Sequence, residues 1–383
     1  MRYIWNLKGW PNFKWRNDEM INVLGKARLA QGKLLSRISS MGLDQNQESR
    51  TEILIEETIK TAAIEGVLFD RESVRSSIVR KLGLPSSDLK RPDRNAEGLI
   101  DVIIDAQENY KKPLTLSRIK SWQASLFPAG YSGLKKIVTG RWRQENPMQV
   151  VSGPIGREKV HYEAPPGGKI PFEMKLFLNW WKKGNPFNPA RANKKKSPDG
   201  LLRAGIAHFY FVTVHPFEDG NGRIARALTD MALAQDENTA KRYYSMSGRI
   251  MAERKSYYEI LEKSQKGSLD ITEWLLWFLN CYTHSIQDSE ASIGNIIKKA
   301  LFWQKHSQSA LNINQRKVIN RLLDAGEGGF EGGLTTIKYV GMTKVSRATA
   351  YRDISDMVQK NILAANAQKG RNVSYELIFP SLD

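Results

Sequence analysis

Residues 215–226 read His215-Pro216-Phe217-Glu218-Asp219-Gly220-Asn221-Gly222-Arg223-Ile224-Ala225-Arg226. The stretch joins two segments in which apolar residues recur with helical spacing, one over residues 201–213 and one that begins near Asn221. Gly220, Asn221 and Gly222 can adopt backbone angles that are closed to most residue types, and they stand directly before the second helix. A loop of exposed N–H groups that leads into a helix N-terminus binds anions, because the helix dipole favours negative charge there. The stretch therefore predicts an anion site between two helices.

The charged residues of the stretch indicate which anion it binds. Arg223 and Arg226 are three residues apart, so both project near one face of the first helical turn. Two guanidinium groups beside a row of backbone N–H groups suit a polyphosphate better than a single carboxylate. Asp219 adds a hard oxygen ligand of the kind that holds magnesium beside phosphates. His215, at the mouth of the loop, is suited to act as a base at neutral pH, and we expect Phe217 to point inward and anchor the loop.

The stretch resembles the motif of the Fic family, His-Pro-Phe-x-Asp/Glu-Gly-Asn-Gly-Arg-x-x-Arg, and matches it at all nine specified positions. A capped helix with surface arginines and a buried histidine is the alternative, but such a helix does not require this combination of residues. The resemblance implies a mainly α-helical bundle with a β-hairpin flap. It also implies transfer of AMP from ATP to a Ser, Thr or Tyr hydroxyl of a target protein.

The resemblance further implies a role for each matched residue. His215 would deprotonate the target hydroxyl, which attacks the α-phosphorus while pyrophosphate leaves, and Asp219 would hold magnesium. The phosphate-binding residues that it implies are Gly220, Asn221, Gly222, Arg223 and Arg226. Catalysis of this kind depends mainly on positioning and on the stabilisation of charge.

Two further segments fit the same resemblance. Residues 148–151 and 159–162 have the pattern of two strands with a Gly/Pro-rich turn between them, where relatives carry the flap. The resemblance implies that a target protein binds along this 148–162 flap by strand addition. Tyr257 and Tyr258 resemble the segment that lines the adenine pocket, and Gln265 stands where relatives often have Asn. An ordinary pair of core tyrosines is the alternative.

The segment Thr61-Ala62-Ala63-Ile64-Glu65-Gly66 resembles the inhibitory motif Ser/Thr-x-x-x-Glu-Gly/Asn of the same family. Apolar residues in the preceding segment, from about residue 49, have helical spacing, and Gly66 stands where a helix would stop. Glu65 would then lie at a helix C-terminus, where a carboxylate opposes the dipole and is relieved by a nearby cation. The family supplies Arg226 as that cation, so we expect a bidentate pair between Glu65 and Arg226 that inhibits transfer.

The chain divides into three predicted regions. Residues 1–48 form an aromatic-rich N-terminal module, residues 49–300 a catalytic domain that includes the inhibitory helix, and residues 306–383 a winged helix-turn-helix domain. Besides the helices already named, apolar spacing predicts helices over 71–82, 171–182, 249–263 and 271–285. In the C-terminal region it predicts helices over 314–325, 335–340 and 346–359, followed by strands over 362–365 and 373–379.

The composition excludes several classes of protein. The formal net charge of +18 favours anionic partners, and the single cysteine, Cys281, excludes an internal disulfide. The five histidines form no His/Cys cluster with metal-site spacing, which argues against a zinc enzyme. The N-terminus lacks an apolar signal stretch and no apolar run reaches membrane-spanning length, so we expect a cytoplasmic protein with no membrane partner. The family resemblance also favours a homodimer.

Two other functions compete with AMP transfer. One is a DNA-binding regulator that acts through residues 335–375. Its predicted recognition helix and wing carry Lys344, Arg347, Arg352, Lys369, Arg371 and Asn372. Residues 301–383 hold eleven Lys/Arg and seven Asp/Glu, a modest excess, so protein docking or packing is the alternative for this region. The other is the function of a Fic-type enzyme that removes AMP or transfers another phosphate-containing group. The intact Gly-Asn-Gly and both arginines favour binding of ATP with its phosphates inward, and therefore AMP transfer.

Overall fold

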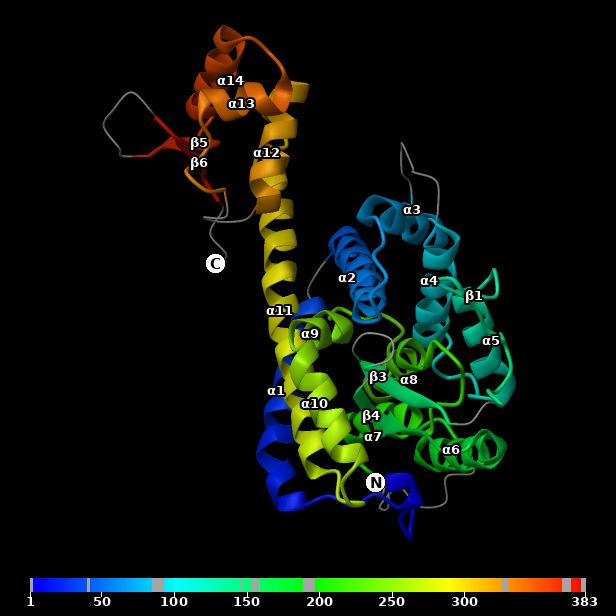
Figure 1. Ribbon diagram of the computed structural model, residues 1–383. Helices are drawn as coiled ribbons and strands as arrows, with labels where there is room; N and C mark the ends of the chain where they lie inside the picture. The colour runs from blue at the N-terminus through cyan, green and yellow to red at the C-terminus, as the bar shows by residue number, and fades with distance from the viewer. Residues whose placement is uncertain are drawn as a thin grey trace. The chain divides into compact units, whose positions relative to one another are not determined.

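The computed structural model describes residues 3–39, 42–84, 93–144, 147–152, 157, 159–188, 197–325, 330–366 and 373–379 (Figure 1). Within these residues the chain is mainly helical, as expected, and its strands form three two-stranded antiparallel sheets. Most of the predicted turn of the 148–162 flap, and the wing residues Lys369, Arg371 and Asn372, lie outside the described residues. No described helix is long and apolar enough to cross a membrane.

The chain forms two compact units. The first comprises residues 1–41 and 50–289, and the second comprises residues 42–49 and 290–383. The boundary falls inside α11 (Thr272–Lys305), which runs past the predicted end at residue 285. It does so because buried apolar residues recur along the helix, among them Ile286, Ile293 and Phe302.

The first unit contains most of the helices of the chain. They are η1 (Ile4–Asn6), α1 (Asn17–Ser39), most of α2 (Leu43–Ile64), α3 (Arg71–Lys81), α4 (Arg94–Glu108), α5 (Leu116–Leu126), η2 (Gly167–Lys169), α6 (Ile170–Gly184), α7 (Gly200–Val214), α8 (Asn221–Glu237), α9 (Met246–Ala252), α10 (Arg254–Gln265) and the first part of α11. Several begin at a side chain that accepts a hydrogen bond from the first turn: Asp70, Asp93, Thr115 and Asp199.

Helix α7 lies at the centre of this unit because its apolar residues point in all directions. Leu201, Phe209 and Phe211 are all fully buried. Gly205 allows α11 to approach closely, since a Cβ at this position would lie 2.9 Å from the ring of Phe278. The Gly205 carbonyl also accepts a hydrogen bond of 2.9 Å from the indole of Trp274. Helix α7 is therefore packed closely against α11 at Gly205.

Two short antiparallel pairs of strands complete the unit. The pair β1 (Tyr131–Ser132) and β2 (Lys135–Lys136) was not predicted. The pair β3 (Gln149–Ser152) and β4 (Lys159–Glu163) lies within one residue of the predicted strands, with a shift of register between Val150 and Val151. Tyr162 of β4 is buried, and its hydroxyl donates a hydrogen bond of 2.6 Å to the carbonyl of Thr213. The β3–β4 pair is thus anchored to the last turn of α7 (Figure 1).

The second unit has the predicted order of elements, and the bounds of each helix and strand lie within three residues of those expected. It contains α12 (Ile313–Ala325), α13 (Thr336–Thr343), α14 (Arg347–Gln359), β5 (Leu363–Ala365) and β6 (Tyr375–Leu377). Buried residues such as Val318, Tyr339, Ile354 and Leu363 form its core. Leu334 forms an antiparallel bridge with Tyr375, the first residue of β6. This order is typical of a winged helix-turn-helix, and that classification stays a prediction.

Candidate active site

The loop between α7 and α8 is shaped by left-handed residues at both of its ends and is closed by the Asn221 side chain. α7 is capped by His215, whose φ of 50° is left-handed, and α8 follows Gly220, whose φ of 90° favours glycine. A Cβ on residue 220 would also lie 3.0 Å from the ring of Phe127. The Asn221 side chain closes the loop, because it accepts from the Phe217 N–H at 2.9 Å and donates to the Phe217 carbonyl at 2.8 Å. Phe217 is fully buried, as expected.

Arg143 holds the same loop from outside, and the sequence analysis did not identify it. Its backbone N–H donates to the Pro216 carbonyl at 3.0 Å, and its Nε donates to the His215 carbonyl at 2.7 Å. Its Nη2 donates to the Pro165 carbonyl at 2.5 Å. Burial lowers the pKa of Arg143 to about 10, so the side chain stays charged at neutral pH. Arg143 lies outside every helix and strand, so no periodic pattern marks it in the sequence.

His215 is arranged as a base. Its Nδ1 lies 3.2 Å from the carbonyl of Val212, which can only accept a hydrogen bond. Nδ1 must therefore carry the proton, which leaves Nε2 bare and able to take one. Burial lowers the pKa of His215 to about 4, against a smaller opposing effect of the Val212 hydrogen bond. The imidazole is neutral at pH 7 and ready to accept a proton.

Arg226 is buried and pairs with the end of α2. Its Nε donates to the Thr61 hydroxyl at 2.5 Å, and its Nη2 donates to the Thr61 carbonyl at 3.0 Å and to Oε1 of Glu65 at 2.7 Å. The expected bidentate pair is thus wrong: a single guanidinium nitrogen binds the carboxylate, and the guanidinium Nε binds Thr61 instead. Burial lowers the pKa of Arg226, but the charge and hydrogen bond of Glu65, together with Tyr257 and Tyr258, outweigh this, and the pKa is raised. Within the described part of the chain, Nη1 of Arg226 is buried without a hydrogen-bond partner.

Glu65 lies over the first turn of α8. α2 ends at Ile64, and Gly66, with a φ of 80°, turns the chain away at the position that the sequence indicates. Oε1 of Glu65 approaches Gly222 so closely that a Cβ on residue 222 would overlap it. Gly222 therefore leaves room for an anionic oxygen above the helix N-terminus, and the Glu65 carboxylate occupies that room.

Asp219 and Arg223 are engaged with each other and with α5 and β1. Nη2 of Arg223 lies 3.5 Å from Oδ1 of Asp219, and its guanidinium lies 4.7 Å from the ring centroid of Phe127. Burial lowers the pKa of Arg223. The Ser132 hydroxyl donates to Oδ2 of Asp219, a contact that the sequence did not predict. One carboxylate beside one hydroxyl fits a magnesium ion that takes its other ligands from phosphates and water. No group of three or more His, Cys, Asp or Glu that could hold a metal occurs among the described residues.

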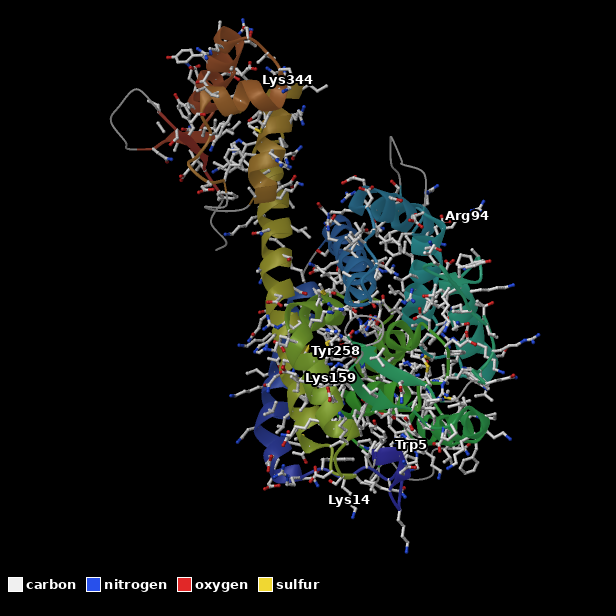
Figure 2. All side chains as sticks on the ribbon, in the orientation of Figure 1. Trp5, Lys14, Arg94, Lys159, Tyr258 and Lys344 are labelled. Carbon is white, nitrogen blue, oxygen red and sulfur yellow. The ribbon has the colours of Figure 1, made fainter. Side chains whose placement is uncertain are left out.

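A cavity of about 1010 Å³ opens beside the loop, walled by β3–β4, α10, the last turn of α7 and the end of α2. The predicted site residues that line it are Glu65, His215, Gly222, Tyr257, Tyr258 and Gln265. Figure 2 labels two lining residues, Lys159 on β4 and Tyr258 on α10. Five predicted residues are absent from this lining as described: Asp219, Gly220, Asn221, Arg223 and Arg226. Arg226 is covered by its contacts to Thr61 and Glu65.

The two tyrosines of α10 differ in their surroundings. Tyr257 is 2% exposed, and its hydroxyl lies 2.9 Å from Nε2 of the buried His208, which the sequence analysis did not identify. Burial lowers the pKa of His208 to about 3, so this histidine is neutral. Tyr258 is 39% exposed, and the Arg254 guanidinium lies 5.5 Å from its ring centroid. Tyr257 is thus tied into the core while it lines the cavity, and Tyr258 offers its ring to an occupant. Gln265 is 4% exposed.

A hydrogen bond that the sequence did not predict joins β4 to α10 at the cavity wall. Nδ1 of His161 lies 2.6 Å from Oε2 of Glu262, and Nζ of Lys266 lies 2.6 Å from its Oε1. Burial raises the pKa of Glu262, but the hydrogen bonds from Lys266 and His161 outweigh this, and the pKa is lowered. These contacts link the strand pair to the helix that carries both tyrosines.

Comparisons with known proteins agree with this geometry. A sequence profile of the Fic/DOC family matches residues 113–233, and a profile of a domain of unknown function, DUF4172, matches residues 3–84. Over 162 residues the chain is 24% identical to a probable protein adenylyltransferase of Aquifex aeolicus, which covers 40% of this chain and 45% of that protein. The chain spans less than half of the length of the curated relatives that it matches.

Two solved structures share the fold. One is a Fic family protein from Desulfovibrio desulfuricans G20, with a TM-score of 0.51 and 17% identity, over 95% of this chain and 97% of that chain. The other is a Fic domain containing signalling protein from Bacteroides thetaiotaomicron VPI-5482, with a TM-score of 0.51 and 18% identity, over 71% of this chain and 96% of that chain. At such identities these structures establish the fold alone.

Proposed function

Because this chain carries a Fic/DOC domain, we propose that it is a protein adenylyltransferase, which moves AMP from ATP to a Ser, Thr or Tyr hydroxyl of a target protein. The observation that carries the proposal is His215, whose Nε2 is bare. His215 lines the cavity that Gly222 and Glu65 also line. A base, an anion site and a cavity of nucleotide size are what this reaction requires. The adenylyltransferase relative of Aquifex aeolicus supports the same class of reaction.

In the proposed transfer, each bond that forms is matched by one that breaks, and the proton has an acceptor. The target hydroxyl oxygen attacks the α-phosphorus of ATP, the new oxygen–phosphorus bond forms, and the bond to the β-phosphate breaks to release pyrophosphate. The hydroxyl proton passes to Nε2 of His215, which is neutral before the step. Magnesium held by Asp219 would neutralise charge on the phosphates.

The first turn of α8 would hold the phosphates. The backbone N–H groups at Gly220, Asn221 and Gly222 contribute the dipole of the helix N-terminus. The Asn221 side chain is engaged by the loop at both ends, so its direct contribution comes from the backbone. Arg223 and Arg226 would bind the outer phosphates, and Arg226 can do so only after it leaves Glu65.

The cavity walls suit the two remaining partners. Tyr258, with its half-buried ring, and the amide of Gln265 would contact the adenine, while Tyr257 shapes the floor of the pocket. The target protein would bind along residues 148–162, where β3 and β4 form an isolated two-stranded sheet among the described residues. A free strand edge recognises a peptide through its backbone and tolerates varied side chains.

We further propose that Glu65 inhibits the enzyme. Its carboxylate occupies the oxygen position above Gly222 and also binds Arg226, so it blocks the phosphate site in two ways. Activation would then require a movement of the end of α2, which removes both effects together.

The test is incubation of the Glu65→Gly chain with ATP labelled at the α-phosphate in a cell lysate, followed by mass spectrometry of labelled proteins. The proposal predicts AMP on a hydroxyl side chain, and no label with Glu65→Gly/His215→Ala. Label from the γ-phosphate instead would show phosphate transfer. Loss of AMP from labelled protein in the presence of wild type, but not of His215→Ala, would show AMP removal.

DNA binding by the second unit is a second candidate function, and the exposed face of α14 favours it. Arg347, Tyr351 and Arg352 are exposed on α14, with Tyr351 at 65%. Among the described residues neither arginine has an ion-pair partner. Of the two acidic residues of α14, Asp353 is buried and accepts from Tyr339 at 2.8 Å, and Asp356 pairs with Lys360 at 2.6 Å. Arg352→Ala should weaken DNA binding and flatten its dependence on salt, and a titration at low salt without binding would exclude this function.

A further inference from the structure

The first residues of the chain form an arm, residues 3–13, that contacts the base of the β3–β4 pair. Nε1 of Trp5 donates to the carbonyl of Glu163 at 2.8 Å. The ring of Tyr3 meets the ring of Tyr162 edge-on, with centroids 5.2 Å apart. Figure 2 labels Trp5 on this arm. The arm belongs to the region that matches the domain of unknown function.

The Trp5 hydrogen bond lies on the outer edge of β4. The N–H of Ala164 donates to the Met148 carbonyl at 2.9 Å, so the backbone groups of Ala164 point toward the β3 side of the pair. Glu163 lies opposite Gln149, one residue along, and backbone groups alternate in direction along an antiparallel strand. The Glu163 carbonyl therefore points away from β3, and Trp5 binds β4 where a further strand would otherwise bind.

Two hydrogen-bonded routes lead from this point to the backbone around His215. Next to Glu163, the Tyr162 hydroxyl donates to the Thr213 carbonyl at 2.6 Å, two residues before His215. Two residues beyond Glu163, the Pro165 carbonyl accepts from Arg143, whose Nε also donates to the His215 carbonyl. Trp5 thus holds β4 between two residues that are bonded to the backbone around His215.

The other end of the arm is anchored in the core. Nε1 of Trp10 donates to Glu173 of α6 at 2.9 Å, and the ring of Phe13 packs edge-on against Tyr210 of α7 at 5.5 Å between centroids. The next residue, Lys14, donates its N–H to the Leu269 carbonyl at 2.8 Å, just beyond α10. An element that is fixed to α6 and α7 at one end can hold β4 in place with the other.

We propose that residues 3–13 are a positioning element of the transfer site: through Trp5 they hold the base of β4, and with it the target-binding strands, at a fixed distance from His215. The proposal rests on the AMP transfer proposed above. It assigns a role to the start of the region of unknown function that is separate from Glu65.

The test compares Trp5→Phe with Trp15→Phe in the full chain carrying Glu65→Gly. Trp5→Phe keeps an aromatic ring but loses the donor to Glu163. Trp15→Phe loses an exposed bond of the same kind, from its indole to Asn17, which does not touch the strands. In Trp5→Phe we expect amide hydrogen exchange in residues 159–163 to be about fivefold faster, the factor that loss of one ordinary hydrogen bond corresponds to. Self-labelling should fall by a similar factor, with ATP affinity unchanged, and Trp15→Phe should match its parent.

A second substitution tests the path to His215. Tyr162→Phe removes the bond to Thr213, and its effect on labelling should not add to that of Trp5→Phe, because both act through the same strand. Unchanged exchange in residues 159–163 of Trp5→Phe, or faster exchange with full labelling, would overturn the proposal. An equal loss of ATP affinity would also overturn it, since the role would then be general stability. If Glu65→Gly with an intact arm does not label, AMP transfer itself fails, and the positioning role with it.

Discussion

Replacement of Glu65 by glycine removes the carboxylate that holds Arg226. Nη2 of Arg226 donates to Glu65 at 2.7 Å, and the remaining bonds of the guanidinium go to Thr61. A hydrogen bond between charged groups contributes about 1.5–3 kcal/mol, and the 28% exposure of the Glu65 side chain places this one near the lower end. About 2 kcal/mol corresponds to roughly thirtyfold in an equilibrium. We therefore expect self-labelling with AMP to rise about thirtyfold in Glu65→Gly. ATP affinity should change much less, because the proposed block acts on the orientation of the bound phosphates more than on binding itself.

The assay follows label from the α-phosphate of ATP into the purified chain, with ATP affinity measured by calorimetry. Glu65→Gln separates charge from volume, since it keeps an atom above Gly222 but weakens the bond to Arg226, and its rate should be intermediate. Arg226→Ala in the Glu65→Gly background should abolish the gain, because the outer phosphates lose their partner. Equal labelling rates in wild type and Glu65→Gly would refute the reasoning and leave Glu65 as an ordinary structural carboxylate.

Other substitutions test the rest of the site. In the Glu65→Gly background, His215→Ala should slow transfer by about 100- to 10,000-fold, while calorimetry still detects ATP binding. Asn221→Ala should lower the free energy of unfolding in urea by about 1–3 kcal/mol, because it leaves the N–H and carbonyl of buried Phe217 unpaired, and Asn221→Asp, which keeps the acceptor, should lose less. The pKa of His215 is lowered to about 4 and that of His208 to about 3, from 6.5 in the unfolded chain. The unfolded chain therefore binds more protons between these values, so stability should be full above about pH 6.5 and decline as the pH falls toward 4, as urea midpoints across this range would check.

Local features of the site could be predicted from the sequence. The glycines and Asn221 indicated the turn into α8, and the apolar spacing located α7, α8 and the end of α2 before Gly66. These features depend on a few adjacent residues, whose backbone preferences act wherever the segment lies in the fold. The two strands at 149–152 and 159–163 were recognisable for the same reason.

Only the tertiary structure decided which distant groups meet the loop. Arg143, Ser132 and Trp5 bind His215, Asp219 and Glu163 from segments that carry no periodic pattern for these contacts. Two of their partners are backbone carbonyls and one is a carboxylate. Which carbonyls remain free to accept depends on the hydrogen bonds that the folded helices and strands have already formed.

The contact between Glu65 and Arg226 depends on the sequence in one respect and on the tertiary structure in another. The sequence by itself determined that a carboxylate stands at the end of α2 and an arginine in the first turns of α8. The tertiary structure decided that Thr61 binds part of the guanidinium, and that Glu65 binds it through a single nitrogen while the Glu65 oxygen lies against Gly222. The physical reason is that hydrogen-bond geometry depends on how two helices dock, and docking is set by packing across the whole core, whereas the identity and order of the residues are local.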